Sequence, residues 1–279
     1  SSDSLLKPFD ITRRDCSDYD VYINIEYCGV CHSDIHMARN EWGGSTIYPI
    51  VPGHEIIGVV NKVGSKVKKF KIGDDVGVGV YVDSCGQCYN CKNNLDHYCE
   101  KGIVLTYNSY EYGTKTITYG GYSKAIVVNQ DYVVKIPKGM DKEKSAPLLC
   151  AGITTYSPLK YFKIGSNHKV GIAGLGGLGH MGLKFAVSFG ANVTVISTSE
   201  SKREESLSLG AHSFVNVKNK EESKEALNSC HYILDTVSSN RNMNELFSWL
   251  RTDGVIMTVG LPTEPHKISG FDLIDKRKC

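Results

Sequence analysis

Short stretches in which apolar and polar residues alternate run through the first half of the chain. Residues 21–27 alternate with a period of two, which predicts a half-buried strand. Turns that contain glycine and lysine, with Gly64 and Gly73 among them, separate this segment from others of the same kind. Many short strands joined by such turns indicate a small, mostly antiparallel β-barrel. The other predicted strands are residues 56–60, 76–80, 126–128 and 133–137.

In the second half of the chain, apolar runs are followed by helical patterns. Residues 170–173 form the first such run, and residues 180–187 form the first helical pattern. Parallel strands joined by helical crossovers make a doubly wound sheet, so this half is predicted to be an α/β domain. The further predicted strands are 193–196, 214–217, 232–237 and 254–260, and the further predicted helices are 220–228 and 243–250.

Composition restricts the possible roles. The chain has 279 residues, enough for two domains, and its net charge of +2 is too small to indicate a nucleic-acid or membrane partner. No apolar run approaches the roughly 20 residues that a membrane-spanning helix needs. Ten cysteines would suit a secreted disulfide-rich protein only in a short chain, so we expect a reducing, cytoplasmic location. Residues 1–4 contain no initiator methionine and no signal-like apolar segment, so we expect trimming there.

Residues 174–179 have the sequence Gly-Leu-Gly-Gly-Leu-Gly and lie between a predicted strand and a predicted helix. Gly174 allows a tight turn, Gly176 lets a pyrophosphate approach the backbone, and Gly179 lets the helix pack close to the strand. The backbone N–H groups and the dipole at the start of the helix, at Gly177 and Leu178, favour phosphate. Glycine-rich turns are common, but these flanks favour a dinucleotide site over a plain strand–helix turn.

Four cysteines stand close together in the first half, at Cys85, Cys88, Cys91 and Cys99. Four thiolates at this spacing can form a closed tetrahedral shell around Zn²⁺, which is a structural site. Disulfides and an iron–sulfur cluster are the alternatives. The expected compartment argues against disulfides, and nothing nearby indicates electron transfer, so we predict structural zinc.

A second possible metal-binding set is dispersed along the chain and consists of Cys31, the pair His54 and Glu55, and Cys150. Two cysteines and a histidine leave a fourth position open for water or a substrate oxygen, as a catalytic zinc needs. Taken singly, Cys150 could be a small buried apolar residue and His54 an ordinary loop histidine. From the residues alone, these two readings are equally acceptable.

Several of these segments occur together, in the same order, in one family. They are residues 31–34, 53–55, 148–152 and 156–159, with the cysteine loop and the glycine turn. On these segments the chain resembles the zinc-dependent medium-chain alcohol dehydrogenases, specifically their cinnamyl-alcohol-dehydrogenase-like branch and its microbial, broad-specificity aldehyde reductases. The resemblance covers nearly the whole chain. It implies a partly open, GroES-like β-barrel as the zinc-binding catalytic domain, residues 1–148, and a Rossmann cofactor domain, residues 149–279.

The resemblance also assigns roles to the possible metal ligands. It implies that Cys31, His54 and Cys150 bind a catalytic zinc, and that Glu55 can join them when the substrate site is empty. The four clustered cysteines match the ligands of a structural zinc. The expected metal content is therefore two Zn²⁺ per chain.

Further roles follow from the resemblance for the residues after Cys31. Ser33 matches the hydroxyl that receives the alcohol proton, and His36 matches the distal end of that proton relay. Asp34 matches a carboxylate near the zinc, and His32 matches a position that faces the cofactor pyrophosphate. The alternatives are that His36 is an exposed histidine and His32 a loop residue.

The segment after the second strand of the α/β half indicates which cofactor is bound. An NAD site usually has Asp or Glu about 20 residues past the glycines, for the ribose 2′-OH. This chain instead has Ser197, Thr198 and Ser199, with Lys202 and Arg203 just after. Hydroxyls and a cation can hold a 2′-phosphate, although the serines could also cap a helix while the cations are solvated. We predict NADP(H), and the run resembles the NADP pattern of the branch.

Together these features predict a zinc-dependent oxidoreductase that transfers a hydride from NADPH to an aldehyde, and in reverse oxidises a primary alcohol. The expected substrates are small aromatic and aliphatic aldehydes, with no nucleic-acid or membrane partner. Residues that could line a substrate pocket, or be ordinary core or surface, are Trp42, Tyr48, Val104, Leu105 and Tyr107.

The chain departs from the family after Cys279, where relatives continue through a sixth Rossmann strand, some nicotinamide contacts and the dimer contact. We therefore expect a fragment or a naturally shortened protein, in which the homodimer of the full-length family is doubtful. One alternative function is a non-catalytic relative that binds NADP and zinc. A zinc-free quinone reductase is a weaker alternative, because it would not need Cys31, Cys150 or the four-cysteine loop.

Overall fold

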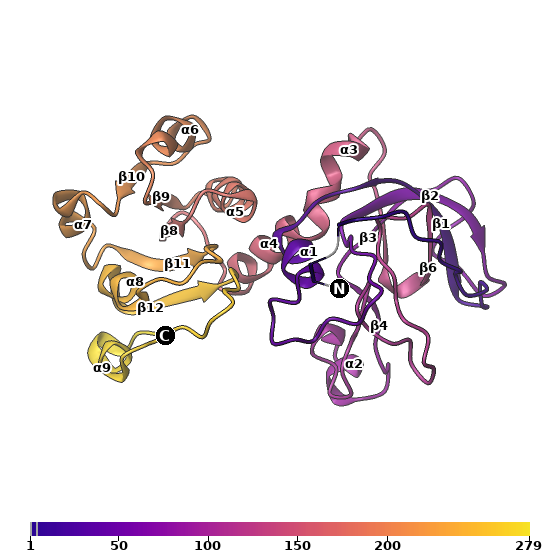
Figure 1. The fold of residues 1–279 in the computed structure, drawn as a ribbon. Helices are drawn as coiled ribbons and strands as arrows, with labels where there is room; N and C mark the ends of the chain where they lie inside the picture. The colour runs from indigo at the N-terminus through magenta and orange to yellow at the C-terminus, as the bar shows by residue number, and fades with distance from the viewer. Residues whose placement is uncertain (1, 4) are drawn as a thin grey trace. The chain divides into compact units, whose positions relative to one another are not determined.

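The computed structural model describes residues 2–3 and 5–279. The chain forms two compact units, unit 1 over Ser1–Cys150 and unit 2 over Ala151–Cys279 (Figure 1). Each unit has its own sheet and its own hydrophobic core. No helix among the described residues has the length and apolar character that crossing a membrane requires.

Unit 1 is built on a five-stranded antiparallel sheet in the order β6-β1-β2-β3-β7, which confirms the partly open barrel predicted for this half. The alternation predicted for β1 is observed, since Val21 and Ile23 are buried whereas Asn24 and Glu26 are exposed. The buried face packs into one apolar cluster. The strands are β1 (Asp20–Cys28), β2 (Ile56–Val63), β3 (Asp75–Val78), β6 (Ala125–Asn129) and β7 (Val133–Lys135).

Short elements fill the connections between these strands. A two-stranded antiparallel sheet consists of β4 (Tyr81–Asp83) and β5 (Val104–Leu105). At the start of the first helix, the backbone N–H of Cys31 donates to Asp34 Oδ2 at 3.0 Å, which satisfies an amide next to the helix terminus. The helices are α1 (His32–Ala38), α2 (Tyr89–Lys92) and α3 (Lys142–Ser145), with 3₁₀ turns η1 (Asp96–Tyr98), η2 (Gln130–Tyr132) and η3 (Ala146–Leu149).

Unit 2 contains a five-stranded parallel sheet in the order β10-β9-β8-β11-β12, as the doubly wound pattern predicts. The strands that follow β8 in the chain, β9 and β10, lie on one side of it, and the later strands β11 and β12 lie on its other side. In sheets of this kind, ligands bind beyond the carboxyl ends of the strands at that switch point. The strands are β8 (Lys169–Ala173), β9 (Asn192–Ser197), β10 (Ser213–Asn216), β11 (Cys230–Asp235) and β12 (Leu250–Thr258).

Helices cover both faces of this sheet. Ile172 and Leu234 belong to a buried cluster with α4 and α5, whereas their chain neighbours Ala173 and Ile233 belong to a second cluster with α8. Successive side chains of a strand point to opposite faces, so the two clusters lie on opposite sides of the sheet. The helices are α4 (Ala151–Tyr161), α5 (Gly177–Ser188), α6 (Arg203–Ser208), α7 (Lys220–Glu225), α8 (Met243–Trp249) and α9 (Gly270–Ile274), with 3₁₀ turns η4 (Glu200–Lys202) and η5 (Asp275–Arg277).

Several elements differ from the sequence expectation. The helix predicted over 220–228 ends at Glu225, and Asn228 has a positive φ of 52°, which a helix does not accommodate. The last strand begins at Leu250 rather than at residue 254. The pattern does not predict α4, because Pro158 and the β-branched Thr154 lower its helix propensity.

Candidate functional site

Four thiols lie together in the segment that follows β4. The Sγ atoms of Cys85, Cys88, Cys91 and Cys99 all lie within 4.8 Å of one another. Cys88 Sγ is 3.4 Å from Cys91 Sγ and 4.0 Å from Cys99 Sγ. Zinc–sulfur bonds of about 2.3 Å in a tetrahedron place the sulfur atoms roughly 3.8 Å apart. The cluster therefore has the size of a closed zinc–thiolate shell.

Backbone amides favour the thiolate forms of Cys88 and Cys99, whereas burial and contacts with these two cysteines raise the pKa of Cys91 to about 11. The N–H groups of Gln87 and Cys88 donate to Cys85 Sγ at 3.5 and 3.4 Å. Burial would raise the pKa of Cys99, but the N–H groups of Cys85 and Lys101 outweigh it and lower that pKa to about 6. Thiolates are the form that binds zinc, so the donor set fits a structural ion.

The second set of possible ligands comes from three separate segments of unit 1. Cys31 directly precedes α1, His54 and Glu55 directly precede β2, and Cys150 directly follows η3. One ligand atom of each of these four residues lies within 4.8 Å of the others, and the two sulfur atoms are 3.8 Å apart. The fold thus brings together residues that are dispersed in the sequence.

Asp34, which is 3% exposed, connects the segments that carry this set. Its Oδ1 accepts the backbone N–H of Gly53 at 2.9 Å and lies 3.0 Å from His54 Nδ1. Its Oδ2 accepts from the backbone of Cys31 at 3.0 Å and from the Tyr122 hydroxyl at 2.9 Å. Because Asp34 occupies Nδ1 of His54, Nε2 is the nitrogen left for a metal ion.

The charges of the cluster depend on one another. Contact with Cys150 lowers the pKa of Cys31 to about 4, whereas the same contact, together with burial, raises the pKa of Cys150. Burial and the Cys31 thiolate raise the pKa of Glu55 to about 7. Burial opposes a charge on His54, but contacts with Asp34 and Cys31 outweigh it and raise its pKa to about 10. Acidic groups this close cannot all ionise without a nearby cation, so a divalent ion fits this donor set.

Two sulfur atoms and one imidazole nitrogen leave a tetrahedral ion with a further position. The Glu55 carboxylate reaches this region because Gly29 has no side chain. A Cβ atom at Gly29 would lie 1.9 Å from Glu55 Oε2. An exchangeable oxygen ligand is typical of a catalytic, Lewis-acid zinc, whereas a structural zinc has a closed set of ligands.

Helix α1 carries the polar residues predicted for proton transfer and cofactor contact. Ser33 is partly buried, and its proximity to Cys31 contributes to the lowered pKa of that thiol. The rings of His32 and His36 stack with centroids 4.7 Å apart. His36 Nδ1 lies 2.5 Å from Glu41 Oε2. His36 Nε2 is buried and has no hydrogen-bond partner among the described residues.

The glycine turn of unit 2 lies between β8 and α5, at the carboxyl edge of the sheet. Gly174 has a φ of +86°, which side chains rarely adopt, and a Cβ at Gly179 would lie 2.1 Å from the Gly174 carbonyl oxygen. These two glycines are required by the turn itself. At Gly176 and Gly177 a Cβ would meet nothing within 4 Å, so those positions keep the start of the helix open. Leu178 lies in the first turn of α5.

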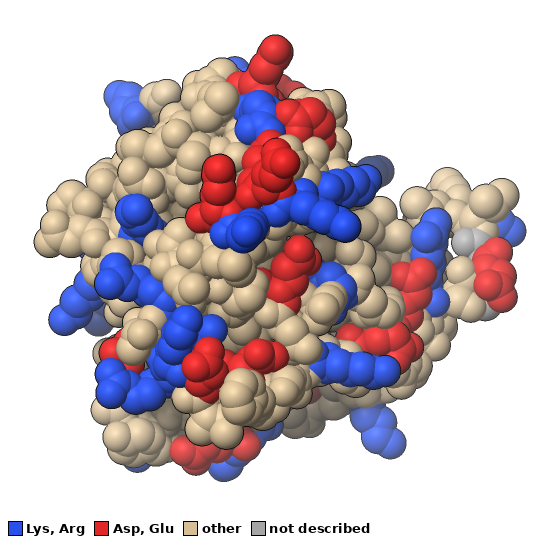
Figure 2. All heavy atoms as spheres, turned by 90° about the vertical axis from the view of Figure 1, so that its left-hand side faces the viewer, with Lys and Arg blue, Asp and Glu red and all other residues tan. Residues whose placement is uncertain are grey.

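The hydroxyls predicted to select the cofactor lie at the end of β9 and just after it. The Ser197 hydroxyl oxygen accepts the backbone N–H of Ser199 at 3.1 Å, and Thr198 is exposed. Lys202 is already paired, with Nζ 2.7 Å from Glu205 Oε2, and Arg203 is 2.9 Å from Glu222. Figure 2 views the protein from a side on which basic and acidic side chains are interspersed. A phosphate at this strand end would compete with Glu205 for Lys202.

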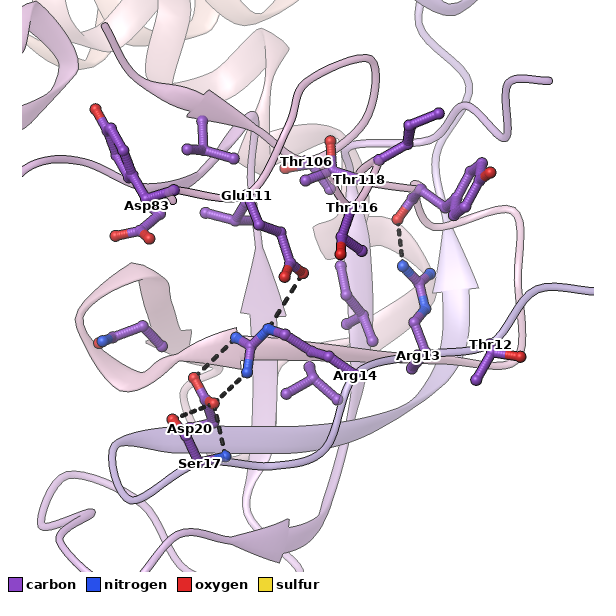
Figure 3. A pocket seen from close by; sticks show the side chains of 18 residues that line it. Thr12, Arg13, Arg14, Ser17, Asp20, Asp83, Thr106, Glu111, Thr116 and Thr118 are labelled. Atoms are coloured by element: carbon purple, nitrogen blue, oxygen red, sulfur yellow. Dashed lines mark hydrogen bonds and ion pairs between the residues drawn. The ribbon is translucent and has the colours of Figure 1, made fainter. Parts of the chain in front are cut away.

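Unit 1 also contains a polar hollow of about 260 Å³ that includes none of the predicted metal or relay residues (Figure 3). Arg14 crosses it and pairs with Asp20 and with Glu111, the latter at 3.2 Å. Val104, considered above for the substrate pocket, lines this hollow. The hollow is therefore separate from the cluster around Cys31.

Sequence reasoning missed three polar residues of these sites. Tyr122 is 88 positions from Asp34, so no local spacing relates the two. Glu205 pairs with both Lys202 and His180 Nε2, but its spacing suggests only a helix-surface ion pair. Glu41 could have been found, because it follows His36 by five residues at the end of a predicted relay segment.

Comparisons with known families match both units. Residues 17–138 match the alcohol dehydrogenase GroES-like domain, and residues 177–279 match the zinc-binding dehydrogenase family. A probable mannitol dehydrogenase from Medicago sativa is 52% identical over 275 residues, which cover 98% of this chain and 76% of the relative.

Two solved structures are similar over almost the whole chain. A cinnamyl alcohol dehydrogenase from Sorghum bicolor is 42% identical with a TM-score of 0.96, over 99% of this chain and 79% of that one. The Helicobacter pylori enzyme of the same name, solved in complex with NADP(H), is 42% identical with a TM-score of 0.92, over 100% and 80% of the two chains.

Proposed function

This chain belongs to the zinc-dependent medium-chain alcohol dehydrogenases, in their cinnamyl-alcohol-dehydrogenase-like branch, and we propose that it reduces a broad range of aromatic and aliphatic aldehydes. As a member it is an NADP(H)-dependent alcohol dehydrogenase that binds zinc. The direction of the reaction and the breadth of substrates are the proposal. The observation that carries it is the convergence of Cys31, His54 and Cys150, with one position left for an oxygen ligand.

In this proposal Cys31, His54 and Cys150 hold the catalytic zinc, and Asp34 keeps His54 oriented. Glu55 would be a further ligand of that zinc when no aldehyde is bound. The cysteines of the structural site are Cys85, Cys88, Cys91 and Cys99. When bound, zinc supplies a Lewis acid that polarises the carbonyl group, and NADPH supplies the hydride.

We propose that residues of α1 transfer the proton that aldehyde reduction requires. Reduction of an aldehyde leaves an oxygen that must gain a proton, and in this proposal the Ser33 hydroxyl donates it. His36, at the distal end of the relay, then returns a proton to the Ser33 hydroxyl. His32 is proposed to face the cofactor pyrophosphate.

Unit 2 provides the cofactor contacts in this proposal. The pyrophosphate binds at the start of α5, against Gly174, Gly176, Gly177, Leu178 and Gly179. The 2′-phosphate binds at Ser197, Thr198, Ser199 and Lys202, in competition with Glu205. We assign residues 1–148 as the zinc-binding catalytic domain and residues 149–279 as the NADP-binding domain, and a reducing, cytoplasmic setting would keep the thiolates able to bind zinc.

The proposal is tested by following NADPH consumption with cinnamaldehyde and with an aliphatic aldehyde of similar length. We expect turnover with both, lost on treatment with a zinc chelator and recovered with added zinc. His54→Ala should abolish turnover, whereas His97→Ala, beside the structural cysteines, serves as a matched histidine control. A chain that holds zinc and NADPH but reduces neither aldehyde would instead support the non-catalytic alternative.

A further inference from the structure

Unit 2 contains a hollow of about 330 Å³ at the edge of its sheet where the strands begin. Lys169 is the first residue of β8, Ser229 directly precedes β11, and Arg251 is the second residue of β12. These three strands are neighbours in the parallel sheet, so their amino ends meet at one edge. The residues that line this basic hollow are Lys169, Asn228, Ser229, Arg251, Thr252 and Lys276.

The basic hollow lies at the opposite edge of the sheet from the glycine turn. Lys169 begins β8, and Gly174 directly follows the last residue of that strand. Five residues of parallel strand, at about 3.3 Å each, separate the two positions by roughly 16 Å. None of the described residues that line the hollow belongs to the positions proposed for the pyrophosphate or the 2′-phosphate. The hollow is therefore separate from the proposed cofactor site.

Three cations of the basic hollow lack an acidic partner. Lys169, Arg251 and Lys276 form no ion pair with a carboxylate of the residues that the structure describes, and Lys276 Nζ instead donates to Asn228 Oδ1 at 2.6 Å. The chain as a whole is nearly balanced, with 32 basic and 30 acidic residues. The hollow therefore has a local excess of positive charge.

The acidic residues that are adjacent in sequence to the lining residues do not offset this excess. Asp253 is paired with Arg277, with Oδ2 2.7 Å from Nη2. Asp275 Oδ2 is 3.8 Å from Lys278 Nζ. Each of these carboxylates thus has a cation of its own, outside the set that lines the hollow.

His231 lies between two donors beside the hollow. Its Nδ1 accepts the backbone N–H of Lys169 at 2.9 Å, and its Nε2 is 2.9 Å from Arg251 Nη1. A neutral imidazole has only one accepting nitrogen, because the other carries a hydrogen. With Nδ1 accepting, the Nε2 hydrogen faces the guanidinium, and two N–H groups meet. His231 therefore gives Arg251 no acceptor, and the guanidinium remains available to an anion.

The surroundings of His231 reflect the same positive charge. Burial lowers the pKa of His231, and the neighbouring Arg251, His168 and Lys169 lower it further. An environment that disfavours a cation in this way favours an anion.

We propose that the basic hollow binds a small phosphate-bearing anion with two or more negative charges, held by Arg251 together with Lys169 and Lys276. A guanidinium presents paired N–H groups that match two phosphate oxygens, and lysines supply compact charges around them. The Thr252 hydroxyl adds a donor that carries no charge. This site is additional to the cofactor site and does not depend on the proposed function.

The test is a calorimetric titration of the zinc-loaded, NADPH-saturated protein with inorganic pyrophosphate at low ionic strength, where exposed charges are least screened. Bound NADPH occupies the glycine turn, so we expect one further anion per chain. Arg251→Gln should lower the pyrophosphate affinity about tenfold or more, because charge-assisted hydrogen bonds are lost. The NADPH affinity of this variant should be unchanged. Total zinc after the titration shows whether pyrophosphate has removed metal.

A pair of lysine variants gives the matched comparison. Lys169→Gln should lower the pyrophosphate affinity about fivefold, because one nearby charge is lost. Lys184→Gln removes an equally exposed charge from α5 and should leave the affinity unchanged. Thermal unfolding without pyrophosphate verifies that the variants fold.

The His231 ring provides a readout at the site itself. Its ¹H–¹⁵N signals, assigned with His231→Gln, should shift when pyrophosphate is added to the unmodified protein. At the same concentration they should shift much less in Arg251→Gln. Shifts of equal size in both proteins would show that the anion does not bind through Arg251 and would overturn the inference.

Two further outcomes would also overturn it. Pyrophosphate binding that disappears once NADPH is bound would belong to the glycine turn. Equal losses in Lys169→Gln and Lys184→Gln would indicate diffuse attraction to a basic surface. If Arg251→Gln does not fold, the two lysine variants still decide the matter. A protein that reduces no aldehyde but binds pyrophosphate in the expected way would refute the proposed function and support this site.

Discussion

At the scale of single residues, the Asp34 carboxylate connects several segments around the proposed metal ligands. It joins the backbone ahead of α1, the backbone ahead of β2, the His54 ring and the Tyr122 hydroxyl. Burial would raise its pKa, but contacts with His54 and with the Cys31 and Gly53 amides outweigh it and lower that pKa. Asp34 therefore remains a carboxylate, the form that can orient a metal-binding histidine.

Asp34→Asn is expected to weaken zinc binding at the Cys31 cluster by about 10- to 100-fold, because the amide presents only one acceptor oxygen to four donors. Competition with a chromophoric chelator measures the affinity, and total zinc shows whether the four-cysteine site is retained. Tyr122→Phe, which removes one of the four donors, should give a smaller loss. Equal affinities in Asp34→Asn and the unmodified protein would mean that His54 does not need this partner.

At the scale of elements, sites whose residues are close together in the sequence could be predicted more completely than the site whose residues are dispersed. The four-cysteine site and the glycine turn could be predicted because their residues lie within one loop and their spacing fixes the geometry. The Cys31 set could not be predicted from spacing, because Cys31 and Cys150 are 119 positions apart and meet only when the sheet of unit 1 forms. The residue types alone made this set only one of two equally acceptable interpretations, and the resemblance to a family favoured it. Contacts to backbone atoms and to Tyr122 depend on loop paths that no local pattern encodes.

The glycine turn gives an element-scale prediction in which neighbouring glycines respond differently. Gly179→Ala should prevent correct packing of α5, because its Cβ would lie 2.1 Å from the Gly174 carbonyl oxygen. Gly176→Ala should leave the unfolding temperature unchanged but weaken NADPH binding about tenfold or more, because its Cβ would occupy the space the pyrophosphate needs. Thermal unfolding and NADPH fluorescence titration measure the two effects. Equal loss of stability in both variants would contradict this division of roles.

A second element-scale prediction concerns the start of β1, where Asp20 binds Arg14 and Ser17 beside the polar hollow (Figure 3). Burial alone would raise the pKa of Asp20, but Arg14 and Ser17 outweigh it and lower it. The contribution of Asp20 to stability is therefore complete above the ordinary pKa of about 3.9 and is lost as pH falls through the lower folded-state value.

Asp20→Asn is expected to destabilise the protein by about 3 kcal/mol at neutral pH, because it leaves Arg14 without its buried partner. The difference should begin to shrink below about pH 4, where Asp20 of the unfolded chain takes up a proton, and should disappear below the lower folded-state pKa. Urea unfolding at a series of pH values measures this. Asp18→Asn, at an exposed ion pair with Lys66, should have little effect and serves as the control.

At the scale of the whole molecule, each unit has its own core and its own candidate ligand. A ligand that binds only the native form of a unit stabilises that unit according to its concentration and affinity. We expect calorimetry to show that a zinc chelator lowers the unfolding temperature of unit 1, and that NADPH raises that of unit 2. Cys91→Ser should reproduce the chelator effect. An unfolding transition that responds equally to both reagents would show instead that the chain unfolds as a single body.

The short distance between Cys88 and Cys91 sulfur atoms, 3.4 Å, and that between Cys31 and Cys150, 3.8 Å, have a consequence for oxidative stress. Bound zinc shields each pair of thiolates from oxidants, but a pair this close can lose two electrons to hydrogen peroxide, which takes up two protons and leaves as two waters. The resulting disulfide no longer binds the ion. Peroxide should therefore release zinc and inactivate the protein together, and a thiol reductant without added zinc should not restore activity.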